Sequence, residues 1–269
     1  MFKEKSHKKG IIRSENYLSS SYRPPKPQAR DQEIKQIVEA LRPLAHRKEP
    51  DNLFIHGPAG VGKTTCIKHV FDNLEQETYA KTVYINCWQY NSRQSLITEL
   101  LIQLGYPAVR RGKAVDELFT KLQTWLDRNR SIAVALDEFD QMSEQEKVIY
   151  DLIQASKNAE HEINLTLISN NKPQSLKFDE RSHSRLNLNH IKFNPYTASQ
   201  LHEILEKRVK EAFRPDSVSD DIIWSISEYI AEKSGDCRDA LDLLLRAARK
   251  ADYQNERKVK GKHLQKAKQ

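Results

Sequence analysis

Apolar residues follow two alternating patterns along the first two thirds of the chain. Short apolar runs occur at 53–55, 82–86, 132–136 and 165–169, whereas apolar residues recur every three or four positions near 30–44, 63–74, 96–104 and 115–126. The first pattern favours strands and the second favours helices. Strands that alternate with helices predict an α/β domain, with a parallel sheet covered by helices on both faces.

The pattern changes at both ends of the chain. Beyond Pro195 only helical spacing remains, near 197–212, 219–234, 236–252 and 259–267. Residues 1–29 are polar and end in the Pro-rich stretch 22–27, which cannot continue a helix and predicts an extended arm. We therefore expect three parts, an N-terminal arm at 1–29, an α/β base at 30–194 and an all-α lid at 195–269.

Composition narrows the class of protein only slightly. The 269 residues contain 38% hydrophobic and 30% charged residues and carry a formal charge of +7, which permits a polyanionic partner but does not require one. The three cysteines are far apart and have no CxxC spacing, which predicts neither a zinc site nor a disulfide framework. No run approaches the ~18 apolar residues of a membrane span, and no apolar stretch follows the basic start. These observations predict a cytoplasmic protein without a membrane partner.

The stretch 57–64 matches the phosphate-binding pattern G-x-x-x-x-G-K-[ST] at every fixed position. Its glycines allow successive backbone N–H groups to face phosphates, and the positive end of the following helix adds to this attraction. A chance glycine-rich turn is the alternative, but a strand precedes this loop and a helix follows it. Lys63 is expected to contact the β- and γ-phosphates, and Thr64 to bind Mg²⁺. The expected nucleotide-binding residues are Gly57, Pro58, Ala59, Gly60, Val61, Gly62, Lys63, Thr64 and Thr65.

Polar residues end two of the other predicted strands. Asp137 and Glu138 follow the apolar run at 132–136, so Asp137 is expected to orient the metal and Glu138 to polarise an attacking water. An Asp-Glu pair after a strand is also commonly a helix cap. Asn170 follows the run at 165–169, where it can position the water or simply form a turn.

Four features in order resemble the origin-recognition-complex and CDC-type replication-initiator family of AAA+ ATPases, best known from archaea and eukaryotes. They are the phosphate loop, Leu136-Asp137-Glu138, Ile168-Ser169-Asn170 and the stretch 235–241, Gly-Asp-Cys-Arg-Asp-Ala-Leu. The stretches 29–34, 104–112 and 194–196 support the resemblance. It extends from about residue 17 to residue 267, and implies an AAA+ fold, ATP or ADP with Mg²⁺ as ligands, and slow ATP hydrolysis.

The resemblance also implies roles for particular residues. Arg238 is similar to the family's lid arginine that reaches the γ-phosphate, Asn170 to its water-positioning polar residue, and Arg181 to its arginine finger, with Arg185 as a rival. Tyr22, Arg30 and Tyr196 correspond to residues around the adenine. The family's extra helical insertion corresponds to residues 91–113, where Arg110, Arg111 and Lys113 are the expected contacts to DNA phosphates.

The resemblance further implies a nucleoid-associated switch in DNA replication initiation, with double-stranded DNA, a replicative helicase and other initiator subunits as partners. Family members normally continue into a winged-helix domain, whereas this sequence ends at Gln269, so we expect only weak DNA binding. Two alternatives share the nucleotide pocket. One is an AAA+ ATPase that serves a transposase or plasmid system, and the other is an adaptor that holds nucleotide with little turnover.

Overall fold

The computed structural model describes residues 10–46, 48–106, 114–128, 131–157, 163–175 and 186–269. The chain divides into two compact units. One, here called the sheet unit, comprises residues 30–58 and 62–193. The other, here called the helical unit, comprises residues 1–29, 59–61 and 194–269.

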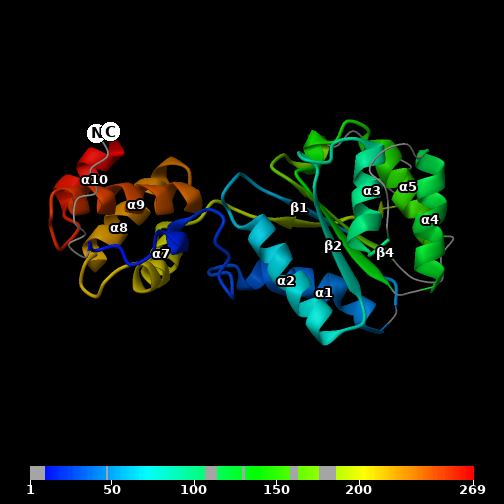
Figure 1. Cartoon of the computed structure of the whole chain (residues 1–269), viewed down its shortest axis with the longest axis horizontal. Coiled ribbons are helices and arrows are strands. Elements are labelled where there is room, and N and C mark those ends of the chain that lie inside the picture. Colours follow the sequence, from blue (N-terminus) through cyan, green and yellow to red (C-terminus); the bar gives the residue numbers. More distant parts are fainter. Residues whose placement is uncertain (1–9, 47, 107–113, 129–130, 158–162, 176–185) are drawn as a thin grey trace. The chain divides into compact units, whose positions relative to one another are not determined.

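The sheet unit is built on five parallel strands in the order β2-β3-β4-β1-β5 (Figure 1). The strands are β1 (Leu53–His56), β2 (Lys81–Asn86), β3 (Ile132–Asp137), β4 (Ile163–Ser169) and β5 (Asn189–Lys192). Every residue of β3 and β4 is buried, as expected for central strands covered on both faces. The predicted parallel α/β sheet is confirmed.

Helices cover both faces of this sheet. Those of the sheet unit are α1 (Asp31–Leu41), α2 (Lys63–Glu77), α3 (Arg93–Gln103), α4 (Val115–Arg128) and α5 (Gln145–Lys157). In Figure 1, α1 and α2 lie on one face, and α3, α4 and α5 lie on the other. A large core lies under the second group, where Leu96, Leu122 and Leu152 are fully buried in one cluster with apolar residues of the strands.

Two elements of the sheet unit were not predicted from the hydrophobic pattern. The edge strand β5 buries only Ile191 among its four residues, so its sequence has no apolar run. Helix α5 was not singled out, although its buried residues include Val148, Ile149 and Leu152 at helical spacing. An edge strand needs few apolar side chains because one side of its backbone and much of its surface face solvent.

The helical unit contains α7 (Ala198–Ala212), α8 (Asp220–Lys233), α9 (Cys237–Tyr253) and α10 (Gly261–Lys268). Thr197 begins α7 with a capping box that it forms with Gln200, and the Asp236 side chain caps α9. The apolar stripes of these helices meet in one core that includes Leu205, Ile226 and Leu244. Among the described residues no helix is long and apolar enough to cross a membrane.

The arm belongs to the helical unit and is partly ordered by it. It contains a short 3₁₀ helix, η1 (Glu15–Leu18), which the Pro-rich pattern did not predict. Ile11 and Leu18 are buried in the helical core, and the Arg13 N–H donates to the carbonyl of Ala212 at 2.8 Å. Burial of Ile11 and Leu18 in the core of the helical unit therefore holds this part of the arm in place, although its other residues are mostly polar.

Candidate nucleotide site

The phosphate loop leaves β1 and enters α2 with glycines at positions that other residues do not fit. Gly57 has φ 151°, and a Cβ at this residue lies 2.1 Å from the carbonyl oxygen of Phe193. Gly62 has φ 92° and immediately precedes Lys63, the first residue of α2. Positive φ values favour glycine because it has no Cβ, so both residues set the path of the loop. The loop thus places Lys63 and Thr64 on the first turn of a helix.

Lys63 is only 7% exposed, and three acceptors satisfy its ammonium group. Its Nζ donates to the carbonyl oxygens of Gly57 and Pro58, both at 2.7 Å, and to Oδ1 of Asn170 at 2.9 Å. A buried ammonium is stable only when its donors are paired. The contact with Asn170 joins the loop after β1 to the residue after β4, because these strands are neighbours in the sheet.

Thr64 and Asp137 form the second contact of the site. The Thr64 hydroxyl donates to Oδ2 of Asp137 at 2.6 Å, and Asp137, at the end of β3, is 4% exposed. Hydroxyl and carboxylate oxygens are the ligands that Mg²⁺ prefers, so this pair fits a magnesium ion bound together with phosphates. Among the described residues no group of three His, Cys, Asp or Glu side chains forms a separate metal site.

The structure adds Tyr84 to this site. Its hydroxyl donates to the same Oδ2 of Asp137 at 2.6 Å, and the Lys68 ammonium lies 3.6 Å from the centre of its ring. Burial raises the pKa of Tyr84, and the neighbouring Asp137 carboxylate raises it further, so the phenol remains a neutral donor. The register pairs Tyr84 with Ala135, and since side chains alternate along a strand, Asp137 lies on the same face. This spacing is the signal that sequence inspection missed.

Glu138 directly follows β3 in a left-handed conformation. Its φ is 55° and its ψ is 41°, and its N–H donates to Oδ1 of Asp137 at 2.9 Å. A non-glycine residue rarely adopts this conformation, which makes the chain turn immediately after the strand. A 3₁₀ helix, η3 (Phe139–Gln141), follows, and Asp140 accepts from the Ser169 hydroxyl at 2.7 Å. The acidic pair is therefore held at the carboxyl edge of the sheet beside the end of β4.

The residues predicted to surround adenine have local partners in their own units. Arg30, in the sheet unit, is 2% exposed, pairs with Glu33 at 2.6 Å and lies 5.2 Å from the ring centre of Phe193. In the helical unit, the Tyr196 N–H donates to the Gly235 carbonyl at 3.0 Å, and the Tyr22 ring lies 4.3 Å from the guanidinium carbon of Arg208. A contact of these residues with adenine remains a prediction.

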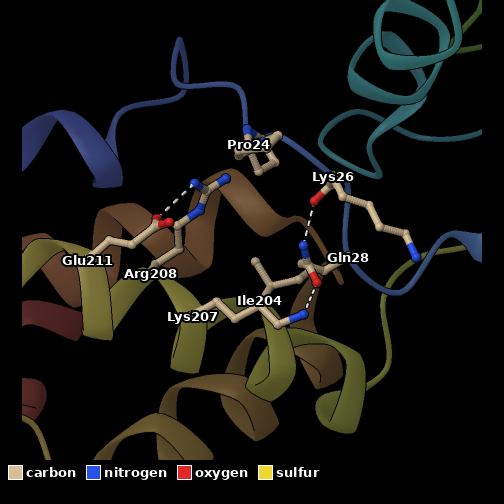
Figure 2. Close-up of a pocket in the computed structure, with 8 residues that line it drawn as sticks. Pro24, Lys26, Gln28, Ile204, Lys207, Arg208 and Glu211 are labelled. Atoms are coloured by element: carbon tan, nitrogen blue, oxygen red, sulfur yellow. Dashed lines mark hydrogen bonds and ion pairs between the residues drawn. The ribbon is translucent and has the colours of Figure 1, made fainter. Parts of the chain in front are cut away.

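A pocket of about 240 Å³ lies beside Tyr22, between the arm and α7 (Figure 2). Lys207 on α7 donates across the pocket to Gln28 of the arm, whereas Nη1 of Arg208 lies 3.7 Å from Oε2 of Glu211 within α7. The pocket is lined by Pro24, Pro25, Lys26, Gln28, Ile204, Lys207, Arg208 and Glu211. The Lys207–Gln28 contact therefore joins the arm to α7.

The remaining predicted residues are placed as follows. Arg238 lies exposed in the first turn of α9, where its N–H donates to Oδ1 of Asp236 at 2.7 Å. Its approach to the γ-phosphate remains a prediction. Arg181 and its rival Arg185 lie outside the described residues, as do the three expected DNA contacts Arg110, Arg111 and Lys113.

Two family models match different parts of the chain. An AAA domain matches residues 46–174, and a Cdc6 AAA+ ATPase-type lid domain matches residues 202–269. Together with archaeal ORC1-type relatives at about 30% identity over nearly the whole of this chain, these models show that the chain belongs to the ORC1/Cdc6 family of AAA+ ATPases. The family suggested by the motifs, and the AAA+ fold with a helical lid, are thus confirmed.

Similar proteins come from archaea. The chain is 30% identical to ORC1-type DNA replication protein 10 of Halobacterium salinarum over 97% of this chain and 66% of that protein. It is 31% identical to ORC1-type DNA replication protein 1 of Archaeoglobus fulgidus over 96% of this chain and 65% of that protein. The solved structure of the Aeropyrum pernix ORC1 protein in complex with DNA has a TM-score of 0.83 and 28% identity, covering 96% of this chain and 69% of that one. The chain therefore spans about two thirds of the length of these relatives.

Proposed function

We propose that this chain binds ATP with Mg²⁺, hydrolyses it slowly, and uses its nucleotide state to control origin DNA binding and helicase loading in replication initiation. The observation that carries the proposal is the cluster at the carboxyl edge of the sheet, where Lys63 contacts Asn170 and Thr64 contacts Asp137. Relatives named as replication proteins, and one related structure in complex with DNA, support the process and the DNA partner.

The proposed mechanism consists of positioning and charge neutralisation. The Lys63 ammonium, already held near the loop carbonyls, neutralises phosphate charge, and the N-terminus of α2 adds its partial positive charge. Thr64 and Asp137 would hold Mg²⁺, which supplies further neutralisation of the phosphates when bound. Glu138 polarises the attacking water and Asn170 orients it, so no covalent enzyme intermediate is needed.

Substitution of Lys63 by Ala tests the nucleotide site. We expect Lys63→Ala to abolish ATP binding in isothermal titration calorimetry, because the phosphates lose the point charge that neutralises them. Circular dichroism should show an unchanged fold, since the hydrogen bonds of Lys63 to Gly57, Pro58 and Asn170 lie at the carboxyl edge of the sheet and outside the apolar core. ATP binding at wild-type affinity by this variant would contradict the proposed role of the loop.

Substitution of Glu138 by Gln separates turnover from binding. An amide has nearly the shape of the carboxylate but is a poor base, so Glu138→Gln should bind ATP normally and release little phosphate. Asp137→Asn should instead weaken the Mg²⁺-dependent part of binding, because Asp137 faces Thr64. Normal phosphate release by Glu138→Gln would remove its catalytic role, and tight binding without turnover in the wild-type chain would indicate a nucleotide-holding adaptor.

A further inference from the structure

Positive charge is strongly segregated along the sequence. Residues 246–269 contain nine Lys and Arg against two Asp and Glu, a net +7 that equals the formal charge of the whole chain. The other 245 residues are therefore balanced, with 35 basic and 35 acidic side chains. From Arg257 to Gln269 there are six Lys and Arg and not a single Asp or Glu. A surface that only needs to be soluble carries both signs interspersed, so this segregation requires another explanation.

The segment folds so that its cations remain at the surface. Helix α10 buries His263, Leu264 and Ala267 against the helical core, which leaves Lys262 and Lys266 on its outer side. These two lysines are four residues apart and therefore lie one above the other along the helix. In Figure 1, α10 is the last helix of the chain and lies beside α9.

Several cations in this region are only partly neutralised, and some are not neutralised at all. Lys260 and Lys262 share the single carboxylate of Glu256, and their hydrogen bonds lower the pKa of Glu256 to about 2. This group of three charges keeps one net positive charge. Within the described part of the chain, Arg257, Lys258 and Lys266 have no ion-pair partner, and all three are exposed. Intramolecular pairing thus does not account for these three cations.

One exposed aromatic side chain lies among these cations, and a second, Tyr229, is half-buried with the Lys268 ammonium 3.9 Å from its ring centre. Tyr253, the last residue of α9, is 81% exposed, and Lys250 precedes it by three residues on the same side of the helix. Proteins that bind single strands stack successive bases on several aromatic residues, whereas duplex recognition relies chiefly on contacts to phosphates. One exposed Tyr among several cations fits a phosphate backbone better than a series of unstacked bases.

We propose that α10, the loop before it and the end of α9 form a surface that binds the phosphate backbone of duplex DNA. The surface comprises Lys250, Tyr253, Arg257, Lys258, Lys262 and Lys266. The choice of duplex DNA as the polyanion rests on the proposed function, whereas the charge segregation does not. The surface is separate in sequence from the predicted contacts at 110–113, and it recognises DNA without reading its bases.

The test compares two variants that remove the same charges. Arg257→Gln/Lys258→Gln/Lys266→Gln removes three exposed cations from the surface, and Arg42→Gln/Lys48→Gln/Lys157→Gln removes three exposed cations from the sheet unit. Both have the same net charge and the same residue types replaced. Binding is measured by fluorescence anisotropy with a labelled duplex of about 30 base pairs at several salt concentrations from about 50 mM upward.

We expect the surface variant to bind every duplex at least about tenfold more weakly at 50 mM salt, with the slope of log affinity against log salt reduced by about 2 to 3. The sheet-unit variant should bind like the wild type. Arg257→Lys/Lys258→Arg/Lys266→Arg should also retain binding, because phosphate contacts need charge rather than one side chain. Circular dichroism confirms that each variant is folded.

Three results would overturn the proposal. The first is that the surface variant binds duplex DNA with wild-type affinity, and the second is that both triple Gln variants lose the same affinity. The third is that the wild-type chain binds single-stranded DNA or RNA about tenfold or more tightly than duplex DNA. ATP binding and turnover are measured on the same proteins. A wild-type chain that binds duplex DNA through this surface but fails to bind ATP would refute the proposed nucleotide function and leave the DNA surface standing.

Discussion

At the scale of single residues, the acceptor pattern of Asp137 is the most informative feature of the site. One carboxylate oxygen, Oδ2, accepts from both Thr64 and Tyr84, and the other, Oδ1, accepts from the Glu138 N–H. A buried carboxylate requires such donors because removal from water is costly when charge is left unpaired. Tyr84 therefore fixes the orientation of the Asp137 carboxylate, which we propose as a ligand of the metal.

Substitution of Tyr84 by Phe tests this positioning role. Loss of a hydrogen bond to a buried charge costs about 1 to 3 kcal/mol, so Tyr84→Phe should lower the free energy of unfolding by that amount. It should also weaken ATP binding with Mg²⁺ more than ATP binding without Mg²⁺. A merely structural role of Tyr84 would change both affinities by the same factor. Urea unfolding and calorimetry measure the two effects. Tyr79→Phe is the matched control, because Tyr79 is 80% exposed, and equal effects of the two substitutions would contradict the assignment.

At the scale of elements, the N-terminal cap of α10 depends on the protonation state of His263. Nδ1 of His263 accepts from the Lys260 N–H at 3.0 Å, and the His263 side chain is fully buried. Burial lowers the pKa of His263 below its usual 6.5, the Glu256 carboxylate opposes this shift, and Lys262, Lys260 and Lys266 reinforce it. Protonation of Nδ1 removes the acceptor, so the cap exists only while the ring is neutral.

The sign of the resulting pH dependence follows from this shift. Since the folded pKa lies below the unfolded one, the unfolded chain takes up the proton first as the pH falls. The contribution of His263 is therefore complete above about pH 7 and decreases below about pH 6.5. His263→Gln keeps a neutral acceptor at the same helix position and should lose this dependence. Urea unfolding is measured at about pH 7.5 and about pH 5.5. The free energy of unfolding should fall more between these pH values in the wild type than in His263→Gln, and equal decreases in the two proteins would exclude this role.

At the scale of the whole molecule, hydrolysis is predicted to depend on contacts between copies of the chain. If Arg181 completes the site of a neighbour, Arg181→Ala should bind ATP normally but hydrolyse it poorly, because such a charge is worth on the order of 10³ or more in rate. Mixing this variant with Lys63→Ala should restore some turnover, since each supplies the group that the other lacks. Phosphate release measured over a dilution series provides the check. A constant rate per chain on dilution, with no recovery in the mixture, would place Arg181 within its own subunit.

The sequence by itself determined the features that depend on local spacing. Apart from α5 and β5, the order of strands and helices followed from apolar periodicity, and the phosphate loop followed from glycines and a lysine at fixed positions. Lys63 and Thr64 were predicted from the loop pattern, and Asp137 and Asn170 from the ends of recognisable strands. The structure brings them into two contacting pairs, and their roles with nucleotide stay predictions. The excess of Lys and Arg in the last residues can also be counted in the sequence. Which of these side chains form ion pairs is known only from the structure.

Only the tertiary structure decided which distant side chains meet. The strand order places β4 beside β1 and thereby joins Asn170 to Lys63, and the register of β2 on β3 joins Tyr84 to Asp137. The edge strand β5 and the ordered part of the arm also escaped prediction. The physical reason is the same throughout, because apolar periodicity reports how a segment buries its own side chains and contains no information on the segment against which it packs.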